Sequence, residues 1–221
     1  MMIDPSSFTF FVVVIIVALV FELSNGFNDA ANAIATVVST RVMSPFQAVL
    51  MAAMMNFVGA ITGTAVAKTV GKGVVDPGAL SGDLGMLTVG AGVLAAALWV
   101  FTATRFGMPV SGSHSLVSGV AGAGIAHAGW DILVGAGIKK IGLGLMFSPI
   151  LGFLFGYAIM LAIYWTFRRV SPSMVSAIFG KLQIGTAAAM AFSHGSNDAQ
   201  KTMGIITLAL SVFYDWESKG I

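Results

Sequence analysis

Apolar runs long enough to cross a bilayer follow one another along most of this chain. Hydrophobic residues make up 57% of the sequence and charged residues only 9%, whereas a soluble domain carries about 25% charged residues. A helix of about 20 apolar residues spans roughly 30 Å of hydrocarbon. We therefore expect an all-α, polytopic helical protein of the cell membrane, with the lipid bilayer as its surroundings.

The runs also set the helix bounds that we expect. The 11 basic residues lie between the runs and form no single stripe, so nucleic acid is not an expected partner. The segment 171–181 is short and moderately apolar, and we expect it to be an interfacial connector. The expected helices cover residues 8–23 and, after a break, 29–40; 45–67; 85–104; 108–126; 132–163 in two pieces; and 182–192 followed by 202–213.

One polar motif occurs twice within this apolar sequence. Residues 24–30 read SNGFNDA and residues 193–199 read SHGSNDA, and one constant offset relates every position of the two copies. An aspartate at bilayer depth costs roughly 2.5–3.5 kcal/mol on insertion scales, so it persists mostly where it faces a cavity or a cation. Duplication of this kind is typical of transporters built from internal repeats.

The motif also suggests a break in its helix. Glycine permits unusual backbone dihedrals, and asparagine and aspartate can cap a new half-helix. In repeat-built transporters, substrate and coupling ions bind where such helices break. A purely structural capping role for both aspartates remains an alternative.

A second polar element, residues 109–115 (PVSGSHS), precedes a glycine-rich apolar stretch. Clustered hydroxyls and free amides at a helix N-terminus can hold an anion without a fixed positive charge. The flanking apolar runs are short enough for a re-entrant helix pair. The alternative is that these hydroxyls only bond to the preceding helical turn.

With these three segments, the sequence resembles the inorganic phosphate transporter (PiT) family of secondary carriers. The residues that carry the resemblance are 26–33, 109–119 and 192–199, in this order. The family has two inverted repeats with broken helices, and each repeat contributes an Asn-Asp motif and a re-entrant segment around a central phosphate. The resemblance implies symport of inorganic phosphate with H⁺ or Na⁺, and no other cofactor.

The resemblance also implies roles for individual residues of this chain. Phosphate would contact Ser111, Ser113, His114 and Ser115. The coupling ion or proton would be handled by Asn28, Asp29, Asn32, Asn197 and Asp198, with Glu22 as a further proton-relay candidate. If the coupling ion is Na⁺, its ligands would be Asp29, Asn28, Asp198 and Asn197.

Two positions depart from the family pattern. Gly112 stands where the family usually has a hydroxyl residue. Lys201 stands at the position equivalent to Asn32 in the other motif copy, where a lysine would repel Na⁺ and attract phosphate. Lys201 is thus a phosphate-binding candidate and favours H⁺ over Na⁺, unless it only pairs with Asp198 or points to an interface.

The length of the chain sets the expected domains. Residues 1–170 would form a first repeat, and residues 171–221 the start of a second. At the constant offset, the second-repeat partners of Ser111 and Ser113 fall beyond Ile221, so we expect a truncated second repeat. Other readings are a non-transporting fragment that needs a second chain, a homodimer, or a carrier of sulfate or metal-phosphate.

Enzyme and channel activities fit the sequence poorly. Ser113 and His114 are adjacent and lack an oriented acidic third member, so they do not indicate a hydrolase. A passive anion channel would not need duplicated carboxylates, which raise the barrier for anions. We expect no enzymatic activity.

Overall fold

The computed structural model describes residues 5–80 and 82–214, and these residues are almost entirely helical. The described elements are α1 (Pro5–Ser39), α2 (Pro45–Ile61), α3 (Ala65–Gly73), η1 (Pro77–Ala79), α4 (Gly82–Arg105), α5 (Gly112–Ala128), η2 (Trp130–Ile132), α6 (Gly135–Phe167) and α7 (Pro172–Tyr214). Within these ranges, four helices are long and apolar enough to cross a membrane, or up to five if the bent pair α2–α3 counts as one span. The prediction of an all-α, polytopic membrane protein is confirmed.

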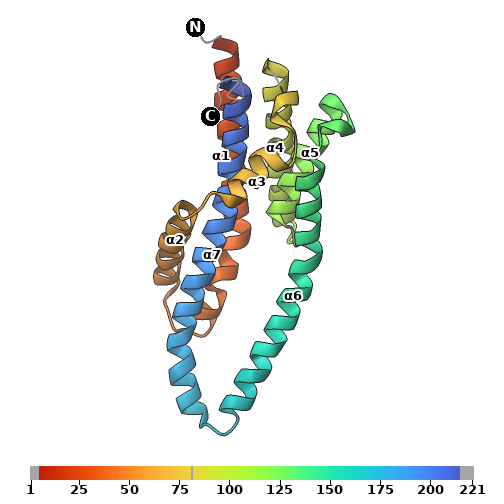
Figure 1. Ribbon diagram of the computed structural model, residues 1–221. Helices are drawn as coiled ribbons and strands as arrows, with labels where there is room; N and C mark the ends of the chain where they lie inside the picture. Colours follow the sequence, from red (N-terminus) through yellow and green to blue (C-terminus); the bar gives the residue numbers. More distant parts are fainter. Residues whose placement is uncertain (1–4, 81, 215–221) are drawn as a thin grey trace.

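Helices α1 and α7 lie side by side and run in opposite directions (Figure 1). Near one end of the pair, the rings of Phe11 and Phe213 stack with centroids 4.9 Å apart. Near the other end, Thr40 Oγ1 donates to Gln183 Oε1 at 2.7 Å. The two motif copies lie between these contacts, so the antiparallel pairing brings them together.

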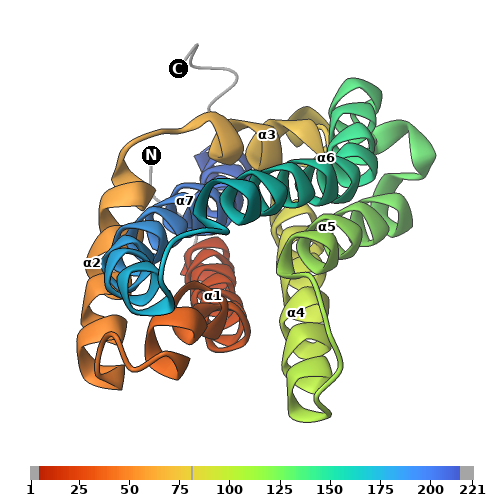
Figure 2. The same cartoon turned by 90° about the horizontal axis from the view of Figure 1, so that it is seen from below.

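Two neighbours flank this central pair on opposite sides, α2 against α7 and α4 against α1 (Figure 2). The α2–α7 contact is close because Gly59 has no side chain: a Cβ there would lie 2.2 Å from the Phe192 carbonyl oxygen. Small residues of this kind let membrane helices approach each other. Gly59 therefore lies on the packing face of α2 against α7.

Helices α4 and α5 form a hairpin. Gly92 and Gly119 face each other across it, and a Cβ on Gly119 would lie 2.3 Å from the Gly92 carbonyl oxygen. The turn of this hairpin lies against Asn28 of α1: at the end of α4, Thr104 Oγ1 donates to Asn28 Oδ1 at 3.4 Å, and in the connection the Val110 carbonyl oxygen accepts from Asn28 Nδ2 at 3.4 Å. The hairpin therefore delivers the serine-rich segment at the start of α5 to the first motif copy (Figure 1).

The largest buried cluster joins α1, α4, α5 and α7. Its fully buried members include Phe21, Val93, Leu116 and Leu208. Helix α6, in contrast, has no buried residue. Its Ile138 and Ile141 pack partly against this cluster, and most of its apolar side chains beyond them are exposed. The hydrophobic core thus packs against one end of the motif region and holds the hairpin on α1.

The predicted breaks at the two motifs are wrong. Helix α1 continues through residues 24–30 and α7 continues through residues 193–199, and residues 171–181 belong to α7 almost entirely instead of forming a connector. Neither Gly26 nor Gly195 has a positive φ. The physical reason is that neither motif contains proline, and several motif side chains bond to neighbouring helices instead of capping new ones.

Three other bounds differ from the expected ones. The predicted helix 45–67 is instead α2 and α3, bent by 65°. The helix expected from residue 108 starts at Gly112, because Pro109 precedes it and Ser111 caps it. The two pieces expected in 132–163 are one helix, α6, which continues through Pro149.

Candidate functional site

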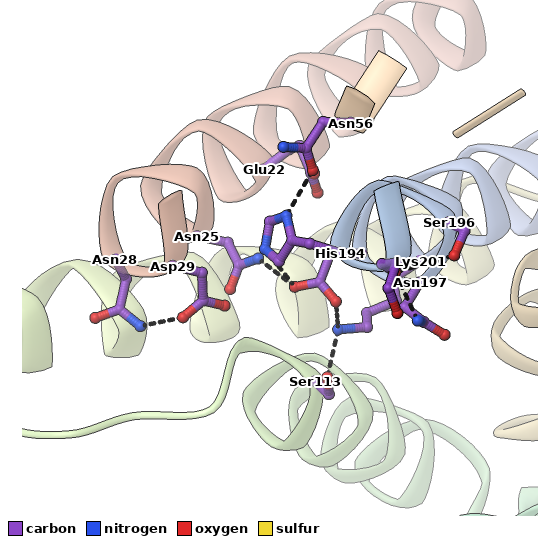
Figure 3. Close-up of polar contacts among 12 residues, drawn as sticks. Glu22, Asn25, Asn28, Asp29, Asn56, Ser113, His194, Ser196, Asn197 and Lys201 are labelled. Atoms are coloured by element: carbon purple, nitrogen blue, oxygen red, sulfur yellow. Dashed lines mark hydrogen bonds and ion pairs between the residues drawn. The ribbon is translucent and has the colours of Figure 1, made fainter. Parts of the chain in front are cut away.

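The two motif copies meet in a direct side-chain contact. Asn25 Nδ2 on α1 donates to Asp198 Oδ2 on α7 at 3.1 Å (Figure 3). Asn25 is only 2% exposed, and its Oδ1 atom has no hydrogen-bond partner among the described residues. The buried amide holds one oxygen of the Asp198 carboxylate in place. Because the acceptor is charged, this hydrogen bond is stronger than one between two neutral groups.

Asp29, the aspartate of the first copy, lies one turn further along α1. Its Oδ1 accepts a hydrogen bond of 2.9 Å from Asn28 Nδ2. The same Asn28 amide lies 3.4 Å from the Val110 carbonyl oxygen, just before α5, while Asn28 Oδ1 accepts from Thr104. Asn28 therefore ties the first aspartate to both sides of the α4–α5 connection.

His194 of the second copy lies between Asn56 of α2 and the two aspartates, and Figure 3 shows its ring pointing toward Asn56. Asn56 Nδ2 donates to the Ala52 carbonyl oxygen at 2.8 Å, so Asn56 Oδ1 faces His194 Nδ1 at 2.7 Å and accepts a hydrogen bond from it. His194 Nε2 then faces Asp198 Oδ2 at 3.4 Å. One ligand atom each of Asp29, His194 and Asp198 lie within 4.8 Å of one another.

Lys201 brings a positive charge into the same place. Its Nζ lies 2.5 Å from Asp198 Oδ1, and it also donates to Ser113 Oγ at the start of α5. Lys201 and Asp198 are 12% and 14% exposed, so water screens their charges only weakly. This lysine links the carboxylate of the second motif to the serine-rich segment.

A cavity of about 320 Å³ lies where these groups converge. The Ser111 side chain accepts the His114 amide and so caps α5. The first amides of a helix have no carbonyl one turn earlier to donate to, so the start of α5 offers anion-binding donors next to this cavity. The polar side chains that line the cavity are Asp29, Asn32, Ser111, Ser113, His194, Asp198 and Lys201.

Gly112 lies where α5 comes closest to α1. A Cβ at this position would be 1.8 Å from Asn25 Oδ1 and 2.7 Å from Asn25 Cγ. The family usually has a hydroxyl residue at this position, but in this structure any side chain at residue 112 would collide with Asn25. The missing side chain lets the serine-rich segment approach the first motif copy.

Glu22 lies outside this cavity. Its Oε2 accepts a hydrogen bond of 2.5 Å from Thr202 Oγ1, and it lines a second hollow of about 740 Å³ together with Asn56 and His194. His194 lines both hollows. Glu22 is therefore separated from the two aspartates by the histidine.

Besides Glu22 and Asn28, three predicted residues do not join the cavity lining. His114 is exposed and lines a separate hollow. The Ser115 hydroxyl donates to the Ser111 carbonyl oxygen one turn earlier, as in the alternative reading of this segment. Asn197 is exposed, and its amide donates to the Ser193 carbonyl oxygen on its own helix.

Sequence reasoning gave no role to three residues that the structure brings into the site. Asn25 and His194 occupy equivalent positions of the two motif copies, so the duplication could have marked them. Asn56 stands alone in the apolar sequence of α2. A lone asparagine in a membrane helix is a weak signal, and only the packing of α2 on α7 explains it.

Comparison with known proteins identifies the family of this chain. The model of the phosphate transporter family matches residues 25–220. A relative from Bacillus subtilis is 44% identical over 199 residues, covering 90% of this chain and 59% of the relative. One from Rhizobium meliloti is 40% identical over 205 residues, covering 92% and 60%. Both are named "Probable low-affinity inorganic phosphate transporter", and this chain spans about three fifths of their length.

A shorter relative and a solved structure complete the comparison. The relative from Streptomyces halstedii, with the same name, is 44% identical over 197 residues, covering 87% of this chain and 89% of the relative. A solved structure described as "The sodium-dependent phosphate transporter" shares the fold, with a TM-score of 0.75 and 22% identity, over 96% of this chain and 69% of that one. Such relatives are transporters, not enzymes. This multi-pass membrane chain belongs to the phosphate transporter family.

Proposed function

We propose that this chain takes part in secondary active transport of inorganic phosphate across the cell membrane, coupled to H⁺ or Na⁺. The observation that carries the proposal is the cavity of about 320 Å³. It combines two carboxylates with hydroxyls and a helix N-terminus, so one cavity offers groups for a cation and for an anion. Such a pair of functions is what a symporter needs.

The phosphate side of the site is formed by the start of α5 and by Lys201. Ser111 and Ser113 line the cavity, and the Lys201 ammonium lies beside Ser113. Hydroxyls, helix N-terminal amides and an ammonium all donate hydrogen bonds to phosphate oxygens. Ser115 and His114 would serve as supports of this helix start, because neither lines the cavity.

The cation side is formed by the two aspartates. Asp29 and Asp198 line the cavity from α1 and α7, and Asn32 lies beside them. Carboxylates at this depth persist mostly when a cation or a proton compensates them. Lys201 already compensates Asp198, which supports H⁺ over Na⁺ as the coupling ion. Asn28 and Asn197 would act by orienting the motifs, and Glu22 would act as a relay behind His194.

The arrangement of the helices supports the two predicted domains. The equivalent motif copies lie on helices that run in opposite directions, as an inverted duplication requires. We assign residues 1–170 to a first repeat and 171–221 to the start of a second. The final residues of the second domain, 215–221, lie outside the described residues.

The test is uptake of radiolabelled phosphate into proteoliposomes that contain this chain, with an imposed pH or Na⁺ gradient. Asp29→Asn is expected to abolish gradient-driven uptake while leaving membrane insertion intact, because it removes a negative charge but keeps the size of the side chain. Undiminished uptake by this variant would exclude Asp29 from coupling.

Two further arms separate the alternatives. Competition by unlabelled sulfate, or a requirement for a divalent metal, would identify sulfate or metal-phosphate as the substrate. If only co-expression with a complementary chain gives uptake, this chain forms a half-site that a second polypeptide completes. Uptake that ignores both gradients would indicate a channel.

A further inference from the structure

The two halves of the candidate site differ in their fixed charge. Asn32 and Lys201 occupy equivalent positions in the duplicated motif, three residues after Asp29 and Asp198 respectively. Both side chains line the same cavity. Equivalent positions in an antiparallel pair of helices face a shared space, so the replacement of a neutral amide by an ammonium makes this space asymmetric.

Two contacts hold the Lys201 side chain, one with Asp198 and one with Ser113. Its Nζ lies 2.5 Å from Asp198 Oδ1 and donates to Ser113 Oγ, and the side chain is only 12% exposed. The ammonium therefore occupies the space beside the carboxylate where a free cation would bind. The remaining oxygen, Oδ2, accepts from Asn25.

Asp29 has a different environment. Among the residues that the structure describes, Asn28 is its hydrogen-bonding partner, and neither lysine nor arginine pairs with it. Asn32 offers a neutral carbonyl oxygen near it in the cavity. Carboxylate and amide oxygens are ligands that hard cations accept. The negative charge of Asp29 is thus open to a cation that enters from solution.

We propose that Lys201 is a tethered cation that takes the place of one free coupling cation. The Asp198 half of the site carries its compensating charge within the chain, and the Asp29 half alone takes a cation from solution. The proposal rests on the proposed function as a cation-coupled carrier. A site in which both motifs carried the Asn-Asp-x-x-Asn pattern would bind one more free cation than this site binds.

The substitution Lys201→Asn tests this directly, because it gives the second motif the same Asn-Asp-x-x-Asn pattern as residues 28–32. It removes the ammonium and introduces a carboxamide beside Asp198. We expect the variant to bind one more Na⁺ per chain than the wild type. Lys201→Arg keeps a positive charge at this position and is the matched control, which is expected to bind the wild-type number.

The measurement is equilibrium binding of ²²Na⁺ to the purified full chain in detergent, at fixed pH, with choline replacing Na⁺ at constant ionic strength. Lys201→Gln offers the same carboxamide on a longer side chain and serves as a second variant if Lys201→Asn does not fold. Folding is checked by the thermal transition of each variant. A folded Lys201→Asn or Lys201→Gln variant that binds no more Na⁺ than the wild type overturns the proposal.

Binding of ³²P-labelled phosphate to the same samples separates the two proposals. If the wild type binds no phosphate but Lys201→Asn gains one Na⁺, the tethered-cation inference holds and the transport proposal fails. If the wild type binds phosphate but Lys201→Asn binds no additional Na⁺, the tethered-cation inference fails and the transport proposal stands. The two failures are therefore distinguishable in one set of proteins.

Discussion

Replacement of Gly112 by alanine is expected to destabilise the protein through one contact. The new Cβ would lie 1.8 Å from Asn25 Oδ1, 2.7 Å from Cγ and 3.4 Å from Nδ2. Asn25 is only 2% exposed, so its side chain cannot move into solvent. Either α5 moves away from α1, or the amide rotates and loses its 3.1 Å hydrogen bond to Asp198.

The magnitude follows from these two costs. Overpacking costs about 1–3 kcal/mol, and loss of a hydrogen bond to a charged group costs about 1.5–3 kcal/mol. The higher helix propensity of alanine offsets at most about 1 kcal/mol. Because either cost can replace the other, we expect the free energy of unfolding to fall by about 1–3 kcal/mol, measured by reversible unfolding in mixed detergent micelles with tryptophan fluorescence as the signal.

Two control variants isolate the contact between position 112 and Asn25. Gly122 lies in the same helix, with no atom within 4 Å of a Cβ there, so Gly122→Ala is expected to be neutral or slightly stabilising. In an Asn25→Ala background the obstructing amide is absent, and Gly112→Ala should cost much less. If Gly112→Ala costs the same with and without the Asn25 side chain, the close approach of α5 to α1 is not the cause.

Two more substitutions test contacts of α7. Gly195→Ala would place a Cβ 2.0 Å from the backbone carbonyl oxygen of Asn56. Because a backbone atom cannot change rotamer, we expect the free energy of unfolding to fall by about 1–3 kcal/mol. Gly185→Ala, with open space around it, is the control, and equal thermal stability of the two variants would contradict the prediction. Thr202→Val removes the hydroxyl that donates to Glu22 at nearly constant volume, and should lower the unfolding free energy by about 1–3 kcal/mol, while Thr202→Ser should recover most of it; the same detergent titration measures both.

The helices were predictable where composition alone decides them. The segment 85–104 differs from α4 by only a few residues at its two ends, because a long apolar run has one stable arrangement in a bilayer. Breaks were predicted at the motifs because Gly26, Asn28 and Asp29 are poor helix formers in isolation. In the structure, the side chains of Asp198 and Asn28 bond to groups outside their own helices. They therefore do not compete for the backbone hydrogen bonds of their own helices, and the helices continue.

The polar site was predictable in part. The duplication identified Asp29 and Asp198, and Lys201 was expected to pair with Asp198 or to attract phosphate; the structure places it against both Asp198 and Ser113. The contact of His194 with Asn56 was not predictable. It depends on how closely α2 packs on α7, a distance that no local pattern in either helix encodes.

The unbroken, antiparallel pair α1 and α7 has a mechanical consequence. The pair is joined at Asn25 and Asp198 by a contact of 3.1 Å, and the start of α1 lies about 30 Å from this point at a rise of about 1.5 Å per residue. A pivot of about 5° at the contact would swing that end by about 3 Å but would shift the two joined side chains by only about 0.3 Å. Such a pivot would therefore have to separate the Phe11 and Phe213 rings near one end and the Thr40–Gln183 hydrogen bond near the other, while the charged groups at the contact stayed almost in place.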